Sequence, residues 1–334
     1  MAFNRSNASM YEGRPDDKPA EQQQTWHRWY TGKYGRYYGT WKPTRYLLPC
    51  DSQEDDRLDI MHRFFLEVRQ RDTHLREGLY TYPLPEYPRV LDLGTGTGIW
   101  PIQLAERLGG LGDYHIEGWD LNMNQPEAIP KGVSFRRFDI EDQWVNTDWS
   151  SYDLIHLRSL NGSIEDYPRL YTQIYQHLKP GTGIMEQVEI DFRPRTDDGD
   201  PLWLRNSKLM EWSHTLHQAY SVAGKNLEMN PKTRDMLEAI GFVDVEHKQI
   251  RIPFNPWPAE ESEKEIARWF NLGLTQGLDA ISMCPMVEKM FIPEEAVGAL
   301  LMDVRRDICK REMRTYCTLH TFVARRPPLV SRRA

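Results

Sequence analysis

The sequence predicts an α/β protein built on a doubly wound, mostly parallel sheet, with an N-terminal arm and helical insertions. One observation is a glycine-rich turn at residues 94–98, which links a short apolar run around Val90 to a helix. The other is the alternation of apolar runs with helical segments after this turn. Such alternation is typical of a parallel sheet with helices on both faces.

The first strands and helices can be assigned in chain order. A helix at 103–108 follows the glycine-rich turn, and a second helix at about 166–178 ends at the sequence Lys179-Pro-Gly. The helices separate short apolar segments, as parallel strands require. The expected strands lie at about 90–93, 114–120, 133–139, 151–157 and 183–191.

The glycine-rich turn predicts a nucleoside cofactor. Gly94, Gly96 and Gly98 remove side chains that would block a ligand, and the following helix offers free N–H donors. Taken alone, the turn suits both a dinucleotide and S-adenosylmethionine. A dinucleotide fingerprint places its third glycine three residues after the second, whereas Gly98 follows Gly96 by two positions, so the spacing favours S-adenosylmethionine.

Carboxylates at strand ends are the expected cofactor contacts. Asp92 either holds the turn or accepts from the cofactor's ammonium group. Asp120 lies at about the 20-residue offset at which a strand-end acid binds ribose hydroxyls. Asp139 is expected to accept from the adenine amino group while Ile140 packs on the ring, although Asp139 could instead cap the following turn. The predicted cofactor-binding residues are Asp92, Gly94, Thr95, Gly96, Gly98, Asp120, Leu121, Asp139, Ile140 and Arg158.

Catalytic candidates are few, because methyl transfer from a sulfonium chiefly requires alignment of the nucleophile with the methyl group. His156 at the end of the fourth strand and Glu186 on the fifth are the candidates. Each could instead be a partner in a local salt bridge. Strand alternation places Glu186 and Glu189 on opposite faces, so these two acids are not expected to share a pocket.

Composition narrows the classes of function. A net charge of −7 over 334 residues gives no electrostatic case for nucleic-acid binding. We expect no membrane span and no secretory signal, and hence a cytoplasmic or nuclear protein. The 4 cysteines lack a metal-ligand spacing. His214 and His217 lack a third ligand, so no metal site is expected.

The ordered motifs resemble those of class I S-adenosylmethionine-dependent methyltransferases. They also resemble, more narrowly, the fungal LaeA-like methyltransferases, through the Pro-Cys-Asp pattern at 49–59 and the Glu-Gln-Val-Glu-Ile-Asp strand at 186–191. The resemblance runs from about Tyr30 to Arg326. The class I motifs are Leu91-Asp-Leu-Gly-Thr-Gly-Thr-Gly, Trp119-Asp, Phe138-Asp-Ile-Glu-Asp, Tyr152-Asp-Leu-Ile-His and Leu178-Lys-Pro-Gly.

The resemblance implies a seven-stranded Rossmann-like sheet with S-adenosylmethionine as cofactor. The helix at 232–241 and strands at 242–252 and 316–324 fit the end of such a sheet, whose last strand is antiparallel. Membership also implies a role in fungal secondary metabolism and development. Some members act in nuclear velvet-type complexes or paired with a related methyltransferase. The resemblance implies no particular substrate.

We expect the chain to divide into a disordered tail, an aromatic arm with a lid helix, a methyltransferase domain with two insertions, and a second tail. Aromatic and basic residues alternate in the arm. They suit packing of an irregular arm onto the domain or contact with a protein partner, and stacking on nucleic-acid bases is the less favoured reading. The expected boundaries are 1–25, 26–86, 87–326 with insertions 201–230 and 253–315, and 327–334.

Two segments are candidate lids. The helix at 203–220 carries an aromatic stripe that either covers the substrate or belongs to the core. The stretch at 46–57 is expected to close over the cofactor, with Asp51 or Arg57 free to contact the cofactor or the Asp120 edge. It could instead pack on the outer helices of the sheet without contacting the ligand. Further helices are expected at about 261–283 and 293–314.

Two functions stay open at this point. The first is an enzyme that methylates a small fungal secondary metabolite. The second is a regulatory methyltransferase that acts on or through protein partners in the control of secondary metabolism and development.

Overall fold

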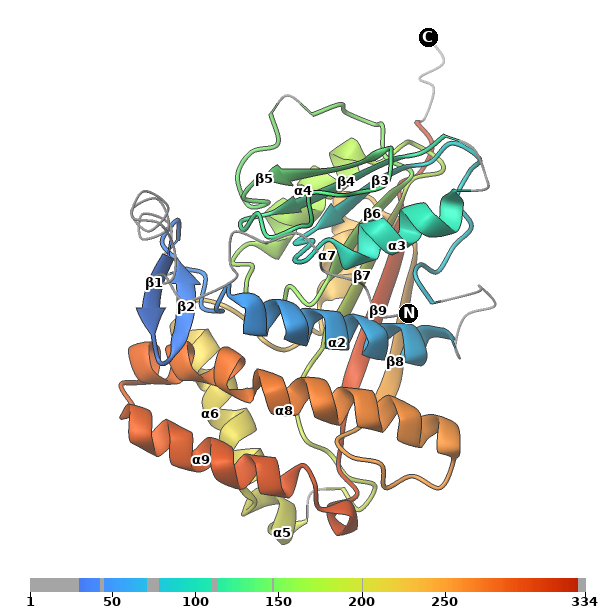
Figure 1. Ribbon diagram of the computed structural model, residues 1–334. Coiled ribbons are helices and arrows are strands. Elements are labelled where there is room, and N and C mark those ends of the chain that lie inside the picture. Colours follow the sequence, from blue (N-terminus) through green and yellow to red (C-terminus); the bar gives the residue numbers. More distant parts are fainter. Residues whose placement is uncertain are drawn as a thin grey trace.

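A seven-stranded sheet organises the chain in the computed structural model, which describes residues 30–42, 45–70, 78–109, 113–145, 147–199 and 201–329 (Figure 1). The expected tail at 1–25, the start of the arm and residues 330–334 lie outside the described residues. The strand order is β5-β4-β3-β6-β7-β9-β8. The strands are β3 (Arg89–Leu93), β4 (His115–Asp120), β5 (Val133–Arg137), β6 (Leu154–Arg158), β7 (Ile184–Ile190), β8 (Val243–Pro253) and β9 (Tyr316–Arg325).

The sheet confirms the predicted fold. Strand β3 pairs in parallel with β4 and β6, and β9 runs antiparallel to both β7 and β8. Val90, Leu91 and Leu93 are fully buried, which explains why the central strand reads as an unbroken apolar run. Helix α3 covers one face, and helices α4 and α7 cover the other. These helices are α3 (Ile99–Leu108), α4 (Tyr167–His177) and α7 (Thr233–Ile240).

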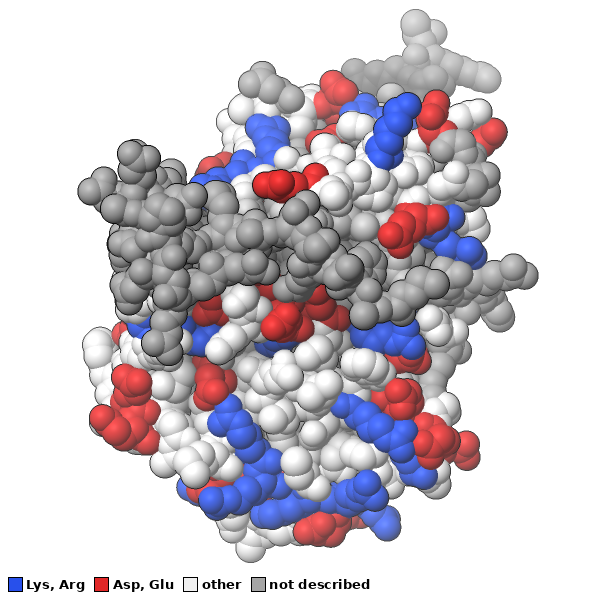
Figure 2. All heavy atoms as spheres, viewed as in Figure 1, with Lys and Arg blue, Asp and Glu red and all other residues white. Residues whose placement is uncertain are grey.

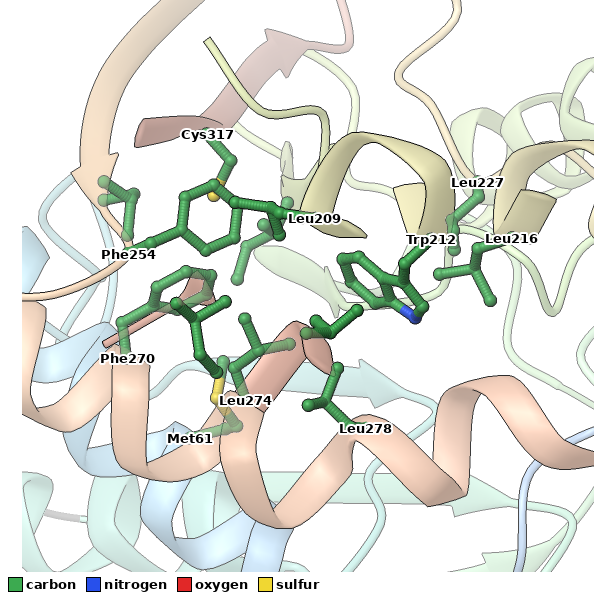
Figure 3. Close-up of a cluster of buried hydrophobic side chains, with 14 of the residues drawn as sticks. Met61, Leu209, Trp212, Leu216, Leu227, Phe254, Phe270, Leu274, Leu278 and Cys317 are labelled. Carbon is green, nitrogen blue, oxygen red and sulfur yellow. The ribbon is translucent and has the colours of Figure 1, made fainter. Parts of the chain in front are cut away.

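The two insertions form a helical layer with α2, beside the carboxyl edge of the sheet (Figure 1). Figure 3 shows Met61 of α2, Trp212 of α6 and Leu278 of α8 pointing into one shared core. Trp212 is fully buried, and its Nε1 donates a hydrogen bond to Ser282 Oγ at 2.9 Å. The helices of this layer are α2 (Ser52–Gln70), α5 (Leu202–Arg205), α6 (Lys208–Val222), α8 (Glu261–Met290) and α9 (Glu294–Asp307).

The predicted limits of the inserted helices were wrong. The helix expected at 203–220 is split, because the Ser207 hydroxyl accepts from the N–H of Met210 and starts α6 as a separate helix. Helix α8 continues through Pro285 to Met290, although proline removes one backbone hydrogen bond. Helix α9 ends at Asp307, before a short 3₁₀ turn at Arg311–Met313.

The arm is a hairpin and not the irregular segment that we expected. Strands β1 (Tyr30–Lys33) and β2 (Arg36–Gly39) are antiparallel and joined by Tyr34 and Gly35, whose φ angles are +52° and +70°. Positive φ at both turn residues matches the twist of a hairpin. Lys33 Nζ donates to Glu288 of α8 at 2.6 Å, so the hairpin is docked on the helical layer.

Charges of both signs are mixed on the face shown in Figure 2, where Lys and Arg lie among Asp and Glu in the part that is not grey. Over the described ranges, no helix is long and apolar enough to cross a membrane. No group of three or more His, Cys, Asp or Glu residues in the same ranges is arranged to hold a metal ion.

Candidate active site

The glycine-rich turn lies at the carboxyl end of β3 and requires glycine at its three positions. Gly94, Gly96 and Gly98 have φ angles of +67°, +55° and +74°, which side-chain-bearing residues rarely adopt. An added Cβ would lie 2.4 Å from a Leu160 methyl group at Gly94, and 2.5 Å from the Phe135 ring at Gly98. The turn is therefore a cradle that only glycine can form.

Asp120 fastens the turn to the end of β4. Its Oδ2 accepts the N–H of Gly96 at 2.8 Å, and its Oδ1 accepts the N–H of Asn122 at 2.8 Å. Burial raises the pKa of Asp120, and the backbone hydrogen bonds oppose that effect. A carboxylate has about four acceptor positions, so these two bonds leave capacity for further donors such as hydroxyl groups.

Asp92 holds the turn from below, which is the first of the two roles considered for it. Its Oδ2 accepts from the Thr95 hydroxyl at 2.6 Å, and its Oδ1 lies 2.7 Å from His156 Nδ1. Thr95 also donates its backbone N–H to the carbonyl of Trp119. The sequence brings these groups together because β3, β4 and β6 are adjacent strands.

Asp139 and Ile140 follow β5, as expected. The Oδ1 of Asp139 accepts the N–H of Glu141 at 3.0 Å, which is the turn cap considered as its alternative role. Lys42, next to the hairpin, forms an ion pair with the same carboxylate. Ile140 is buried, and its carbonyl accepts from Trp144 Nε1 at 3.0 Å. Leu121 is half-buried beside Asp120.

Helix α2 crosses over the turn. An added Cβ at Gly96 would lie 3.2 Å from a Leu58 methyl group, and the Thr97 hydroxyl donates to Asp59 at 2.8 Å. Asn124 of the β4–β5 connection donates to Asp55. The first half of α2 thus lies directly against the cradle, whereas local patterns in the sequence could place it only upstream of the turn.

The expectation for Asp51 was wrong. Its carboxylate accepts from the Arg36 guanidinium at 2.6 and 2.8 Å and from the backbone N–H groups of Tyr37 and Glu54. It therefore caps α2 and anchors the hairpin. Arg57 donates to Glu54 through Nε and Nη2 at 2.9 and 2.6 Å.

His156 and Glu186 lie in a buried row beneath the turn. The His156 ring stacks on Trp100 at 4.0 Å, and its Nε2 lies 4.0 Å from Glu186 Oε1. Glu186 binds Arg69 of α2 at 2.7 Å and accepts the N–H of Thr81 at 2.8 Å. Both candidate catalytic side chains are 1% exposed and are held by contacts within the protein.

The charges of this row are set by burial and pairing. Burial lowers the pKa of His156 although Asp92 opposes it, so the imidazole is neutral and donates Nδ1–H to Asp92. Burial alone would raise the pKa of Glu186, but the Arg69 guanidinium outweighs burial and holds it below its usual value. Glu186 is therefore ionised, and the strand carries a buried ion pair.

Arg158 ends β6 and faces α2. Its Nη2 lies 3.1 Å from His62 Nδ1, and its guanidinium lies 4.7 Å from the centre of the Phe65 ring. Burial lowers the pKa of Arg158 to about 10. Burial also raises the pKa of Tyr46 well above its usual value, although its side chain is only half-buried. Both groups are therefore desolvated although each side chain is still partly exposed to solvent.

Two cavities lie away from the glycine-rich turn. One of about 810 Å³ is lined by Arg195, Leu204 and His214, and one of about 330 Å³ is lined by Tyr82, Asp153 and Ile184. Neither includes a residue of the glycine-rich turn. The chemistry of the cradle, and not cavity size, identifies the candidate site.

Sequence reasoning missed Leu58, Lys42 and Arg69, which contact Gly96, Asp139 and Glu186. Leu58 looked like one apolar position of an amphipathic helix, and Arg69 looked like an ordinary basic residue in a last helical turn. The hairpin had a usable signal, because a residue–glycine pair between two aromatic runs is typical of a two-residue turn.

The fold and the cradle define a methyltransferase, and comparison with known proteins agrees. Residues 60–247, more than half of the chain, match the family model described as Methyltransferase domain. The chain belongs to this family. This confirms the predicted class, an S-adenosylmethionine-dependent methyltransferase.

Within that class the chain belongs with fungal proteins named as secondary metabolism regulators. It is 39% identical over 299 residues to the regulator laeA of Fusarium oxysporum f. sp. lycopersici, covering 88% of this chain and 92% of that protein. It is 40% identical over 299 residues to the regulator LAE1 of Cochliobolus heterostrophus, covering 88% of this chain and 94% of that protein. The predicted LaeA-like resemblance is confirmed.

Solved structures of other methyltransferases are similar at low identity. Phosphoethanolamine N-methyltransferase 2 of Haemonchus contortus, in complex with S-adenosyl-L-methionine, has a TM-score of 0.44 and 17% identity; the match covers 86% of this chain and 56% of that chain. Geranyl diphosphate C-methyltransferase of Streptomyces coelicolor A3(2), in complex with S-adenosyl-L-homocysteine, has a TM-score of 0.42 and 11% identity; the match covers 81% of this chain and 80% of that chain.

Proposed function

We propose that the chain transfers a methyl group from S-adenosylmethionine to a small-molecule acceptor held in the crevice between the sheet edge and the helical layer. In this proposal the ribose hydroxyls bind Asp120, and the adenine lies beside Asp139 and Ile140. The acceptor positions left on Asp120 support the ribose contact. The position of Asp139 at the end of the neighbouring strand β5 supports the adenine contact.

The ion pair between Lys42 and Asp139 is compatible with this arrangement. One carboxylate can accept from a turn amide, an ammonium group and an adenine amino group at the same time. Lys42 would then lie at the outer edge of the adenine site, and the arm would help to close it. This gives the docked hairpin a role in cofactor binding as well as in packing.

Bound S-adenosylmethionine supplies an electrophilic methyl group, and the protein's task is to orient the acceptor and exclude water. His156 and Glu186 fit this task as positioning residues. His156 donates to Asp92, Asp92 accepts from Thr95, and Thr95 is part of the cradle. Glu186 joins the same row to Arg69 of α2. Together they tie the helix above the site to the turn below it.

The observation that carries the choice of a small acceptor is the roof over the crevice. Leu58 lies against Gly96, Arg57 against Gly277, and Tyr220 against Gly162. In this proposal, α2, α6 and α8 enclose the space next to the cradle. Enclosure suits a small molecule, because a small ligand is bound by surrounding most of its surface.

A second function is favoured by the relatives, which are named as regulators of secondary metabolism. A regulatory methyltransferase would act on or through a protein partner, and the arm would be one surface for such a partner. Incubation of the protein with methyl-labelled S-adenosylmethionine and a fungal extract distinguishes the two. Label in the small-molecule fraction supports the first function, and label in a protein band supports the second. Absence of label from both fractions, with cofactor binding intact, would contradict methyl transfer to either class.

The segment 46–57 is proposed as a cofactor lid together with the start of α2. It is anchored by Asp51 at the hairpin and leads directly to Leu58 above Gly96. Hydrogen exchange should show slower exchange at 46–57 when S-adenosylhomocysteine binds, because the ligand orders a segment at the open edge of the site. Equal exchange with and without ligand, while residues 94–98 become protected, would leave the segment a structural role only.

A further inference from the structure

The turn that follows β6, residues 159–162, lies between the glycine cradle and α6. The Leu160 side chain lies against Gly94, and Gly162 lies against the Tyr220 ring of α6. Ser159 has φ of +57°, in the left-handed region that a residue with a Cβ adopts only when its surroundings hold it there. This turn therefore borders the glycine cradle on the side of α6.

Glu189 of β7 holds this turn. Its Oε1 accepts the N–H of Leu160 at 3.1 Å, and its Oε2 accepts the N–H of Asn161 at 3.1 Å. Gln187 Nε2 adds a third donor at 3.3 Å. The Glu189 side chain is 1% exposed, and among the described residues its hydrogen bonds come from amide donors, without a lysine or arginine. Both oxygens of its carboxylate therefore accept hydrogen bonds from the backbone of one turn.

We propose that Glu189 is a positioning residue for methyl transfer: its two carboxylate oxygens fix residues 159–162 against the glycine cradle and so set the wall of the cofactor crevice. The inference rests on the proposed function, because it takes the cradle to be the cofactor site. The bidentate contact requires both oxygens to accept. A protonated or amidated side chain has one acceptor fewer and presents a hydrogen to the turn.

The protonation state of Glu189 should therefore matter. Burial raises its pKa to about 7, in spite of the hydrogen bonds from Asn161, Leu160 and Gln187. Tyr167 and Tyr171 of α4 lie close enough to interact electrostatically with Glu189. His320 is opposite Glu189 in the register of β7 and β9. The turn is thus held most firmly above neutral pH, where the carboxylate is ionised.

The test is calorimetric titration of the full chain with S-adenosylhomocysteine at pH 8 and pH 6. Glu189→Gln should raise the Kd about tenfold at pH 8, because a buried backbone N–H loses its acceptor. The difference from the unmodified protein should shrink to about twofold or threefold at pH 6, where the carboxyl group is largely protonated.

Asp191→Asn is the matched control. Asp191 lies on the same side of the same segment, is also buried, and accepts the backbone N–H groups of Arg193 and Thr318, but it does not contact the turn at 159–162. This variant should unfold at a lower temperature and keep the Kd within about twofold. Leu160→Ala keeps Glu189 and removes the side chain against Gly94, so it should raise the Kd as Glu189→Gln does.

Several outcomes would overturn the inference. One is an unchanged Kd at pH 8 for either folded Glu189→Gln or Leu160→Ala. Another is a loss of affinity in Asp191→Asn equal to that in Glu189→Gln, which would make the effect one of general stability. Failure of the unmodified protein to bind S-adenosylhomocysteine would instead contradict the proposed function itself.

Discussion

Strand β7 carries two buried glutamates in opposite electrostatic situations. Glu186 faces α2 and is neutralised by Arg69 at 2.7 Å, so its pKa lies below the usual value in spite of burial. Glu189 faces the turn at 159–162 and is met by backbone N–H groups, so burial raises its pKa to about 7. The same residue type on one strand is a fixed anion on one face and a titratable group on the other.

The difference shows how the two faces are used. A full opposing charge locks Glu186 and fastens α2 to the sheet, and such a pair changes little over the physiological pH range. Amide dipoles compensate Glu189 only in part, so its charge responds to pH. The face with the ion pair fastens α2 to the sheet, and the face with the amides holds the turn at 159–162.

The largest expected effect comes from breaking the ion pair. Arg69→Met leaves Glu186 buried without a countercharge, which should lower the free energy of unfolding by about 3–5 kcal/mol. Urea denaturation followed by circular dichroism measures this. Adding Glu186→Gln to Arg69→Met should restore part of the loss, because the unpaired charge is removed. A loss below about 1 kcal/mol in the single variant would show that solvent reaches Glu186.

A substitution in the glycine-rich turn tests the assignment of the cofactor site. Gly96→Val introduces a side chain at a φ of +55° and against Leu58, so it should abolish S-adenosylmethionine binding while the folded sheet persists. Thermal unfolding with and without the cofactor reports both properties. Stabilisation by the cofactor equal to that of the unmodified protein would contradict the assignment of the cradle.

The strand-end acid should give a smaller effect. Asp120→Ala removes the acceptor for the ribose hydroxyls and one support of the Gly96 amide, so cofactor affinity should fall about tenfold or more, about 1.4 kcal/mol. Calorimetry measures the Kd directly. Unchanged affinity in a folded variant would exclude Asp120 as the ribose ligand.

The pH dependence of stability separates the two glutamates, and a rise in pKa from 4.5 to about 7 corresponds to about 3 kcal/mol over the whole titration. The pKa of Glu189 rises from 4.5 to about 7 on folding, so the folded protein keeps a proton that the unfolded chain releases. The contribution of Glu189 to the free energy of unfolding is therefore fully present below about pH 4.5 and is lost as the pH rises through 7. Glu186 behaves oppositely, because its lowered pKa stabilises the fold above its unfolded pKa and the benefit is lost in acid.

Urea denaturation of the unmodified protein and of Glu189→Gln between pH 5 and 8 isolates the Glu189 contribution. The stability difference between the two proteins should shift in favour of the variant as the pH rises. A difference that is independent of pH would mean that Glu189 does not titrate in this range.

Much of the fold could be predicted because its signals are local. The positive φ angles at Gly94, Gly96 and Gly98 favour glycine, so this turn can be predicted from the residue types alone. The acids Asp120 and Asp139 follow apolar strands, and parallel topology brings such strand ends to one edge. The aromatic stripe of α6 was harder to interpret, because core helices and lids show the same periodicity. Its burial in the shared core favours packing, and Tyr220 lies against Gly162 in the turn after β6.

By itself the sequence determined the class of fold, the cradle and the acids at its rim, because each depends on backbone geometry within a few residues or on the order of strands. Tertiary structure alone decided what surrounds them. Thr81 and Glu186 are 105 positions apart, and no periodicity links Leu58 to Gly96 or Glu189 to the amides of Leu160 and Asn161. The charge state of a buried carboxylate depends on the donors that packing places beside it. For this reason Glu186 stays ionised near neutral pH, whereas Glu189, on the same strand, titrates there.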